Sequence, residues 1–225
     1  MSKRFQKRLI PSAIAGALAV GLGLAATTGT AQALQQGDWL VRVGASTVEP
    51  NESSSNPTGA LPAGSEVSIN SNTQLSFTVA YMFTNNISFE ILGATPFSHD
   101  ISGAGTLAGA GKIAEIKHLP PTFSVNWHFQ PQARLRPYVG AGINYTYFYD
   151  EKTQGLGATD ISLDSSWGPA VQAGLDYDIN NKWFLNANVR YIKISTTAKL
   201  TGAVTGNLDV DVDPMVYTLA VGTHF

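Results

Sequence analysis

The stretch QLSFTVAYMF, at residues 74–83, carries a large apolar side chain at every second position. The alternation resumes after the turn-forming residues 84–86, and it recurs at residues 122–129 and 183–192. Strict period-two alternation favours half-buried strands over helices. The sequence therefore predicts an all-β fold.

The connections between the predicted strands alternate in length. Eight strands are expected, at roughly 38–48, 72–83, 87–97, 113–129, 136–149, 166–178, 182–197 and 211–225. The short connections are 84–86, 130–135 and 179–181, and the long polar ones are 49–71, 98–112, 150–165 and 198–210. This asymmetry is typical of an eight-stranded antiparallel transmembrane β-barrel with short periplasmic turns and long extracellular loops.

The two faces of the strands separate this barrel from a water-soluble β-sandwich. One face is aromatic and apolar on every strand, whereas the other carries charged and amide side chains: Arg42, Glu90, Asn126, His128, Gln172, Asp176, Asn186, Asn188 and Arg190. A soluble sandwich would turn its apolar face inward, but so aromatic a face is easier to place against lipid. The terminal aromatic Phe225 resembles the signal read by the barrel-assembly machinery, which is therefore an expected partner.

The composition excludes several other classes of protein. The 225 residues include no cysteine, so disulfide scaffolds, cysteine-ligated zinc and thiol catalysis are ruled out. A net charge of -2 leaves no basic surface for nucleic acid. The four histidines are scattered, and adjacent residues on a strand, as in Ser98-His99-Asp100, point to opposite faces. We expect no catalytic residue, no metal site and no cofactor.

The N-terminus has the features of a secretory signal peptide. Four basic residues precede an apolar stretch, and Ala31 and Ala33 fill the small-residue positions of a cleavage site. The expected division is a cleavable signal at 1–33 and a transmembrane barrel domain at 34–225. The alternative is an anchor helix that stays in place.

Several blocks of the mature sequence resemble the outer membrane protein W (OmpW) family. The blocks are 72–75 (NTQL), 90–97 (EILGATPF), 117–122 (KHLPPT), 136–145 (RPYVGAGINY), 164–168 (DSSWG) and 213–214 (DP). The resemblance implies a monomeric barrel in the outer membrane of a Gram-negative bacterium, without a continuous water pore. It also implies passive uptake of small hydrophobic molecules, as in the alkane-uptake relatives, with a sideways exit into the membrane lipid.

The inward-facing positions are graded along the predicted barrel. Near the short turns they are polar, and the expected periplasmic plug consists of Arg42, Glu90, Asn126, His128, Asp176 and Asn186. Toward the long loops they are apolar, and the expected channel residues there are Leu92, Ala94, Phe148, Ile192 and Ile194. Buried charges need partners, and an apolar funnel suits hydrophobic solutes. The alternative is that the apolar residues merely fill the barrel.

Three prolines and a tryptophan complete the candidate site. Pro96, Pro120 and Pro121 interrupt the third and fourth strands, and proline donates no ladder hydrogen bond. They predict a gap that could act as a lateral gate, although a simple bulge would explain them equally well. The resemblance places Trp167 in the channel, whereas its parity along the strand places it outside.

Three function classes stay open at this point. The first is a channel for hydrophobic solutes, the second a structural or adhesin-like surface barrel, and the third an outer-membrane lipid enzyme. An enzyme would need a polar catalytic cluster near the outer leaflet, where the sequence supplies an apolar lumen. An adhesin would need neither a funnel nor a gap between strands.

Overall fold

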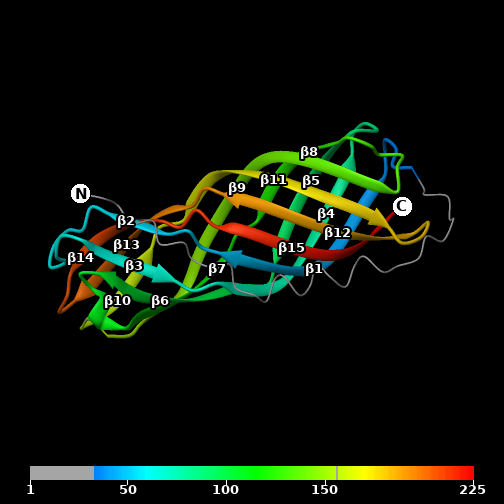
Figure 1. Ribbon diagram of the computed structural model, residues 1–225. Coiled ribbons are helices and arrows are strands. Elements are labelled where there is room, and N and C mark those ends of the chain that lie inside the picture. Colours follow the sequence, from blue (N-terminus) through cyan, green and yellow to red (C-terminus); the bar gives the residue numbers. More distant parts are fainter. Residues whose placement is uncertain (1–32, 156) are drawn as a thin grey trace, which may run out of the picture. The chain divides into compact units, whose positions relative to one another are not determined.

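The computed structural model describes residues 33–155 and 157–225, and these form a β-barrel with a β-stranded extension (Figure 1). Eight antiparallel strands close the barrel, which confirms the expected fold. In their order around the barrel they are β1 (Trp39–Glu49), β4 (Asn72–Met82), β5 (Ile87–Ala94), β8 (Thr122–His128), β9 (Leu135–Thr153), β11 (Ser166–Asp178), β12 (Trp183–Ile192) and β15 (Met215–His224). The pairing of β1 with β15 joins the first and the last strand of the barrel.

The period-two pattern produces two different barrel surfaces. On β4, Phe77 points outward and is 45% exposed, whereas its neighbour Ser76 points inward and is 2% exposed. Successive side chains of a strand lie on opposite faces, so each barrel strand has one outer and one inner row. The inner row of the barrel therefore decides what the protein can hold.

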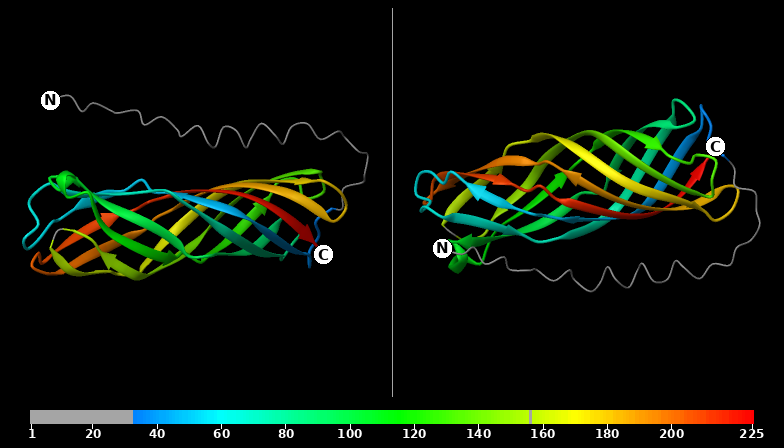
Figure 2. Two further views of the ribbon diagram at one scale, coloured as in Figure 1. Left: turned by 90° about the horizontal axis from the view of Figure 1, so that it is seen from below. Right: turned by 45° about the horizontal axis from the view of Figure 1, so that its top comes forward.

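The expected long loops are in large part strands. β3 (Ser65–Ile69), β6 (Phe97–Gly105) and β7 (Lys112–Leu119) continue the barrel sheet from β9. A second sheet has the order β10 (Ala158–Leu163), β13 (Ser195–Gly202), β14 (Gly206–Asp211) and β2 (Ser53–Ser55). Both views in Figure 2 show these strands prolonging the barrel at one end, which we call the extended end. The long polar connections predicted from the sequence thus contain short alternating segments that pair with one another.

Four expected long strands are each divided where the barrel meets the extension. The divisions fall between β5 and β6, β7 and β8, β12 and β13, and β14 and β15. The first two contain Pro96 and the pair Pro120-Pro121. A proline cannot donate to the ladder, so pairing stops and the strand changes direction. The only helix in the described ranges is the 3-10 turn η2 (Ala108–Ala110). No helix among the described residues is long and apolar enough to cross a membrane.

The opposite end, which we call the turn end, is closed by the start of the described chain. Leu34 is 1% exposed and packs with Leu40, Met82 and Phe184. Its backbone N–H donates to the carbonyl oxygen of Pro131 at 2.9 Å. The residues that follow the expected cleavage position therefore form an apolar floor.

The expected signal peptide falls on residues 1–32, outside the described residues, and on Ala33. Cleavage after Ala33 would make Leu34 the first residue of the mature protein, with its new α-ammonium still able to donate to Pro131. We expect N-terminal sequencing of outer-membrane material to begin at Leu34. A sequence that began at Met1 would contradict the cleavage.

Candidate functional site

The lower half of the barrel interior, toward the turn end, is crossed by a network of buried ion pairs. Arg42 on β1 donates from Nη1 to Glu90 at 3.2 Å and from Nη2 to Asp176 at 2.9 Å. Glu90 on β5 also accepts from Nη2 of Arg190 on β12 at 2.9 Å. All four side chains are almost completely buried. Four strands, β1, β5, β11 and β12, are thus joined by ion pairs inside the barrel.

Amide side chains satisfy the remaining acceptors of the two carboxylates. Asn126 and Gln172 donate to Glu90 at 3.1 and 3.0 Å, and Asn186 donates to Asp176 at 2.8 Å. Buried charges are tolerated when every lone pair has such a partner. We call the set Arg42, Glu90, Asn126, Gln172, Asp176, Asn186 and Arg190 the polar network.

The polar network includes five of the six residues expected in the plug. The sixth, His128, lies beside it, bonded to the Ser88 hydroxyl at 3.0 Å and packed on the ring of Tyr138 at 5.3 Å. Gly140 leaves the room that the network needs, because a Cβ there would collide with the Asn126 amide oxygen. The polar network contains two arginines and two carboxylates, so their charges balance.

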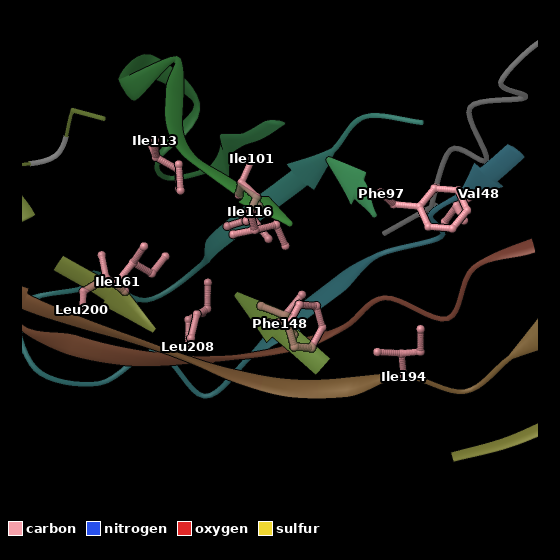
Figure 3. Close-up of a cluster of buried hydrophobic side chains, with 14 of the residues drawn as sticks. Val48, Phe97, Ile101, Ile113, Ile116, Phe148, Ile161, Ile194, Leu200 and Leu208 are labelled. Carbon is pink, nitrogen blue, oxygen red and sulfur yellow. The ribbon is translucent and has the colours of Figure 1, made fainter. Parts of the chain in front are cut away.

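The upper half of the interior is apolar. A cavity runs from the barrel into the extension, with a volume of about 50 Å³, whereas one water needs roughly 10–15 Å³. Figure 3 shows Ile116, Phe148 and Leu208 among the side chains that surround this interior. A smaller cavity lies below it and shares Val48, His118, Ile194 and Pro214 with it. Together they form a narrow apolar space, which we call the upper cavity.

Five of the expected channel residues line the upper cavity. Leu92, Ala94 and Ile192 line its lower part, Phe148 its upper part, and Ile194 both. Trp167 does not. It is 66% exposed and packs outside the barrel on Tyr145, 4.6 Å away between ring centroids. Its strand parity was the better guide, because β11 runs without a phase change from Ser166 and pairs with β9 in regular register.

Many of the residues around the upper cavity were missed by sequence reasoning. Nine of them belong to segments expected to be loops: Leu61, Val67, Ile69, Ile101, Leu107, Ile161, Leu200, Leu208 and Val210. A short alternating signal was present in residues 198–210, where Ala198 and Leu200, then Leu208 and Val210, recur at a spacing of two. His99 was also missed, because its position in Ser98-His99-Asp100 suggested only loop polarity.

A break in the barrel wall lies beside the lower part of the upper cavity. Pairing of β5 with β8 ends at Leu92↔Thr122, and pairing resumes only at Phe97↔His118. Between these pairs, described residues 93–96 and 119–121 have no register partner across the break. We call this the strand break. It contains Pro96, Pro120 and Pro121, and Pro120 itself lines the cavity.

Comparison with known proteins agrees with this architecture. The OmpW family model matches residues 35–225. The chain belongs to the OmpW family. It is 50% identical over 198 residues to outer membrane protein W of Vibrio cholerae, which covers 85% of this chain and 90% of the relative. Outer membrane protein AlkL of Ectopseudomonas oleovorans is 34% identical, covering 84% of this chain and 83% of AlkL. The crystal structure of OprG from Pseudomonas aeruginosa superposes with a TM-score of 0.82 at 37% identity, covering 87% of this chain and 99% of OprG.

Membership of the OmpW family places the barrel in the outer membrane of a Gram-negative bacterium, with the turn end in the periplasm. The outer rows carry large exposed apolar side chains, such as Val43, Phe77, Ile143 and Leu219. Aromatic clusters lie near both ends of this surface, with Trp39 against Tyr81 at 5.0 Å and Tyr147 against Tyr149 at 5.9 Å. Aromatic girdles at the two interfaces are typical of membrane barrels.

The two relatives compared above are named as outer membrane proteins, and neither name is that of an enzyme. In the described part of the chain, no three His, Cys, Asp or Glu side chains group as metal ligands would. Among the described residues that line the upper cavity, only His99 and His118 have titratable side chains.

Burial holds these two histidines in the neutral form. Desolvation, with a smaller repulsion from His99, lowers the pKa of His118 from 6.5 to about 3. Desolvation also lowers the pKa of His99, against the opposing effect of its hydrogen bond to Asn70. The unfolded chain therefore binds more protons than the folded one between pH 6.5 and about 3, so folding stability is lost as the pH falls through this range.

We expect His118→Phe to reduce this acid sensitivity. The measurement is hydrogen exchange of the β6 and β7 amides in nanodiscs at pH 8 and pH 4, with intrinsic exchange rates corrected for pH. In the wild type the free energy of opening should fall toward pH 4, and in the variant it should fall less. An equal fall in both proteins would show that His118 does not titrate in this way.

Proposed function

We propose that this OmpW family member is a passive uptake channel for small hydrophobic molecules. The observation that carries the proposal is an apolar cavity beside a break in the barrel wall. Its lining residues Leu92 and Ile192 are each two positions along their strands from Glu90 and Arg190 of the polar network. A solute would enter from the extracellular side, occupy the upper cavity and leave sideways into membrane lipid. AlkL and the wider resemblance to the OmpW family support the hydrophobic class of solute.

The polar network argues against passage straight through to the periplasm. To pass, an apolar solute would have to displace Glu90 or Asp176 from its hydrogen bond with Arg42. The Arg42 guanidinium would then be buried without that partner, which costs several kcal/mol. Below the network, Leu34 and Phe184 close the turn end. The easier route for an apolar molecule is therefore lateral.

The strand break is held apart by hydrogen bonds on both of its sides. On one side, the Thr95 N–H donates to the Leu75 carbonyl of β4 at 2.8 Å. On the other, the Asn144 amide donates to the carbonyls of Pro120 and Pro121 at 3.0 and 3.2 Å. Each edge is thus bonded to its outer neighbour. This geometry supports a lateral gate at Pro96, Pro120 and Pro121.

The proposed partners follow from the same geometry. They are small hydrophobic solutes and outer-membrane lipid, with the barrel-assembly machinery acting through Phe225. Phe225 is 70% exposed at the end of the closing strand and exchanges backbone hydrogen bonds with Trp39 at 2.9 and 3.1 Å. Because the barrel closes with strands of one chain, we propose a monomer.

Uptake by whole cells tests the channel. Cells lacking their own hydrophobic channels would express the protein, and accumulation of labelled n-octane would be measured. Leu208→Trp narrows the upper cavity, whereas Leu219→Trp makes the same change on the lipid-facing surface. We expect uptake with the wild type and with Leu219→Trp, and a several-fold loss with Leu208→Trp. Uptake equal to that of cells without the protein would contradict the proposal and favour the adhesin-like alternative.

A further inference from the structure

Two histidine side chains interrupt the apolar wall of the upper cavity. His99 on β6 and His118 on β7 lie on the same face, with ring centroids 5.0 Å apart. Both are nearly completely buried, and Phe97 and Phe148 pack against the His118 ring at 5.4 and 5.8 Å. Phenylalanine would fill such a position without a polar atom. Buried polar side chains without partners are rare, and each of them calls for an explanation.

The proton of the His99 ring can be assigned from its single partner. Its Nδ1 lies 2.6 Å from the carbonyl oxygen of Asn70. A carbonyl oxygen only accepts, so Nδ1 carries the proton and Nε2 of the neutral ring has a free lone pair. Nε2 is buried and has no hydrogen-bond partner within the described ranges. His99 lines the upper cavity, so the wall of this cavity includes a residue with an unused acceptor.

His118 adds a second unsatisfied nitrogen, on the ring whose centroid lies 5.0 Å from that of His99. Its Nδ1 is also buried without a partner among the described residues. Its ring lines both the larger and the smaller part of the upper cavity, so a solute moving from one to the other passes it. A neutral imidazole offers one donor and one acceptor. In the tautomer of His118 that carries its proton on Nδ1, one hydroxyl group can donate to His99 Nε2 and accept from His118 Nδ1.

We propose that His99 and His118 form a binding site for the hydroxyl group of an otherwise apolar solute, such as an aliphatic alcohol or a phenol. The inference rests on the proposed uptake function and deepens it. A hydroxyl that enters an apolar cavity without a partner loses its hydrogen bonds to water, which disfavours its entry. The two imidazoles replace these hydrogen bonds, while the apolar side chains of the cavity wall contact the hydrocarbon part of the solute.

The surroundings of the pair disfavour charged solutes. No Lys, Arg, Asp or Glu is among the described residues that line the upper cavity. A carboxylate or an ammonium group would be buried there without a countercharge, which costs far more than a neutral hydroxyl. The chemical class that fits is therefore a neutral molecule with one hydroxyl and a hydrocarbon body.

Imidazole nitrogen chemical shifts test the site without relying on transport. The full mature protein, labelled with nitrogen-15 at histidine, would be placed in nanodiscs and titrated with 1-octanol or n-octane at matched lipid ratios. We expect 1-octanol to change the nitrogen-15 chemical shift of His99 Nε2 in the way that is observed when the lone pair of an imidazole nitrogen accepts a hydrogen bond. n-Octane should leave it almost unchanged. Equal responses to both compounds, or none to 1-octanol, would overturn the site and leave the pair as packing.

Variants separate hydrogen bonding from shape. His118→Phe should raise the half-saturating 1-octanol concentration, measured at His99, by roughly 3- to 10-fold, as expected for one net hydrogen bond. His118→Asn, whose amide can reach the place of Nδ1, should restore part of the loss. His224→Phe is the matched control, because His224 is also buried and unpartnered but lies at the turn end beside Phe184.

The remaining outcomes distinguish this inference from the proposed function. Normal 1-octanol shifts together with absent n-octane uptake by cells would contradict the channel and keep the site. Normal uptake with 1-octanol responses that His118→Phe does not change would keep the channel and overturn the site. Resonances that already report a bonded Nε2 before any addition, and stay unchanged with 1-octanol, would identify water as the occupant and overturn the site.

Discussion

Glu90→Ala is expected to lower the stability of the barrel and to make it conduct ions. Glu90 accepts hydrogen bonds from Arg42, Arg190, Asn126 and Gln172, so its removal leaves the Arg190 guanidinium without a carboxylate partner inside the barrel. Breaking a buried pair in this way costs roughly 3–5 kcal/mol. Water that enters to solvate the arginines would also open a polar path through the lower half. Urea unfolding in lipid vesicles and planar-bilayer conductance measure the two effects.

Two further variants show whether the charge of Glu90 is responsible. Glu90→Gln keeps the shape and some of the hydrogen bonds, so its loss of stability should be smaller but measurable. Glu66→Ala removes an exposed carboxylate of the extension and should behave like the wild type. Unchanged unfolding and unchanged conductance in Glu90→Ala would mean that the polar network neither supports nor seals the barrel.

Pro96→Ala is expected to reduce the uptake of a long-chain apolar solute several-fold while the barrel folds and inserts normally. Successive N–H groups of an antiparallel strand point to opposite neighbours. The Thr95 N–H points to β4, so a new N–H at residue 96 would point across the strand break. The added donor should favour closure of the wall beside the upper cavity. Initial uptake rates by whole cells, at matched amounts of folded protein, are the measurement.

The same route can be blocked without touching the wall. Leu92→Trp would place a larger side chain in the lower part of the upper cavity, and it should also reduce uptake. The double variant should be no worse than the more severe single one, because both obstruct one path in series. Pro137→Ala, at the turn end of β9, is the matched control. Undiminished uptake in Pro96→Ala would contradict the lateral gate and would show that Pro96 only bends the strand.

The barrel could be predicted from sequence because its pattern is local. In β4, apolar and polar residues alternate, so each residue can be assigned to the outer or the inner face from the sequence alone. The strand and its orientation can therefore be predicted without knowing the partner strand. The extension could not be predicted in this way. Its strands are as short as Ser53–Ser55, and β14 pairs with that segment from about 150 residues away. No local sequence pattern indicates that two such distant segments pair.

The residues of the candidate site also differ in whether a local sequence pattern could predict their positions. The positions of Arg42, Glu90 and Asp176 followed from parity alone, although their distances did not. The meeting of His99 and His118 depends on the register of β6 with β7, where Phe97 pairs with His118 and His99 with Ile116. The two histidines are diagonal neighbours, a relation that exists only once the two strands have paired. Trp167 shows the reverse case, since parity placed it correctly and the resemblance did not.

The seam between β1 and β15 has a consequence for biogenesis. Leu40 pairs with His224 and Glu49 with Met215, so the first and last strands of the barrel are neighbours despite the whole domain lying between them in the chain. Hairpins such as β4 with β5 can form as soon as both strands have been exported, whereas contacts of such high sequence separation are slow to form. The cylinder therefore cannot be completed before the last ten residues arrive. Until then, two unpaired edges are exposed to neighbouring chains, so loss of the C-terminal strand should cause aggregation in the periplasm, not a smaller barrel.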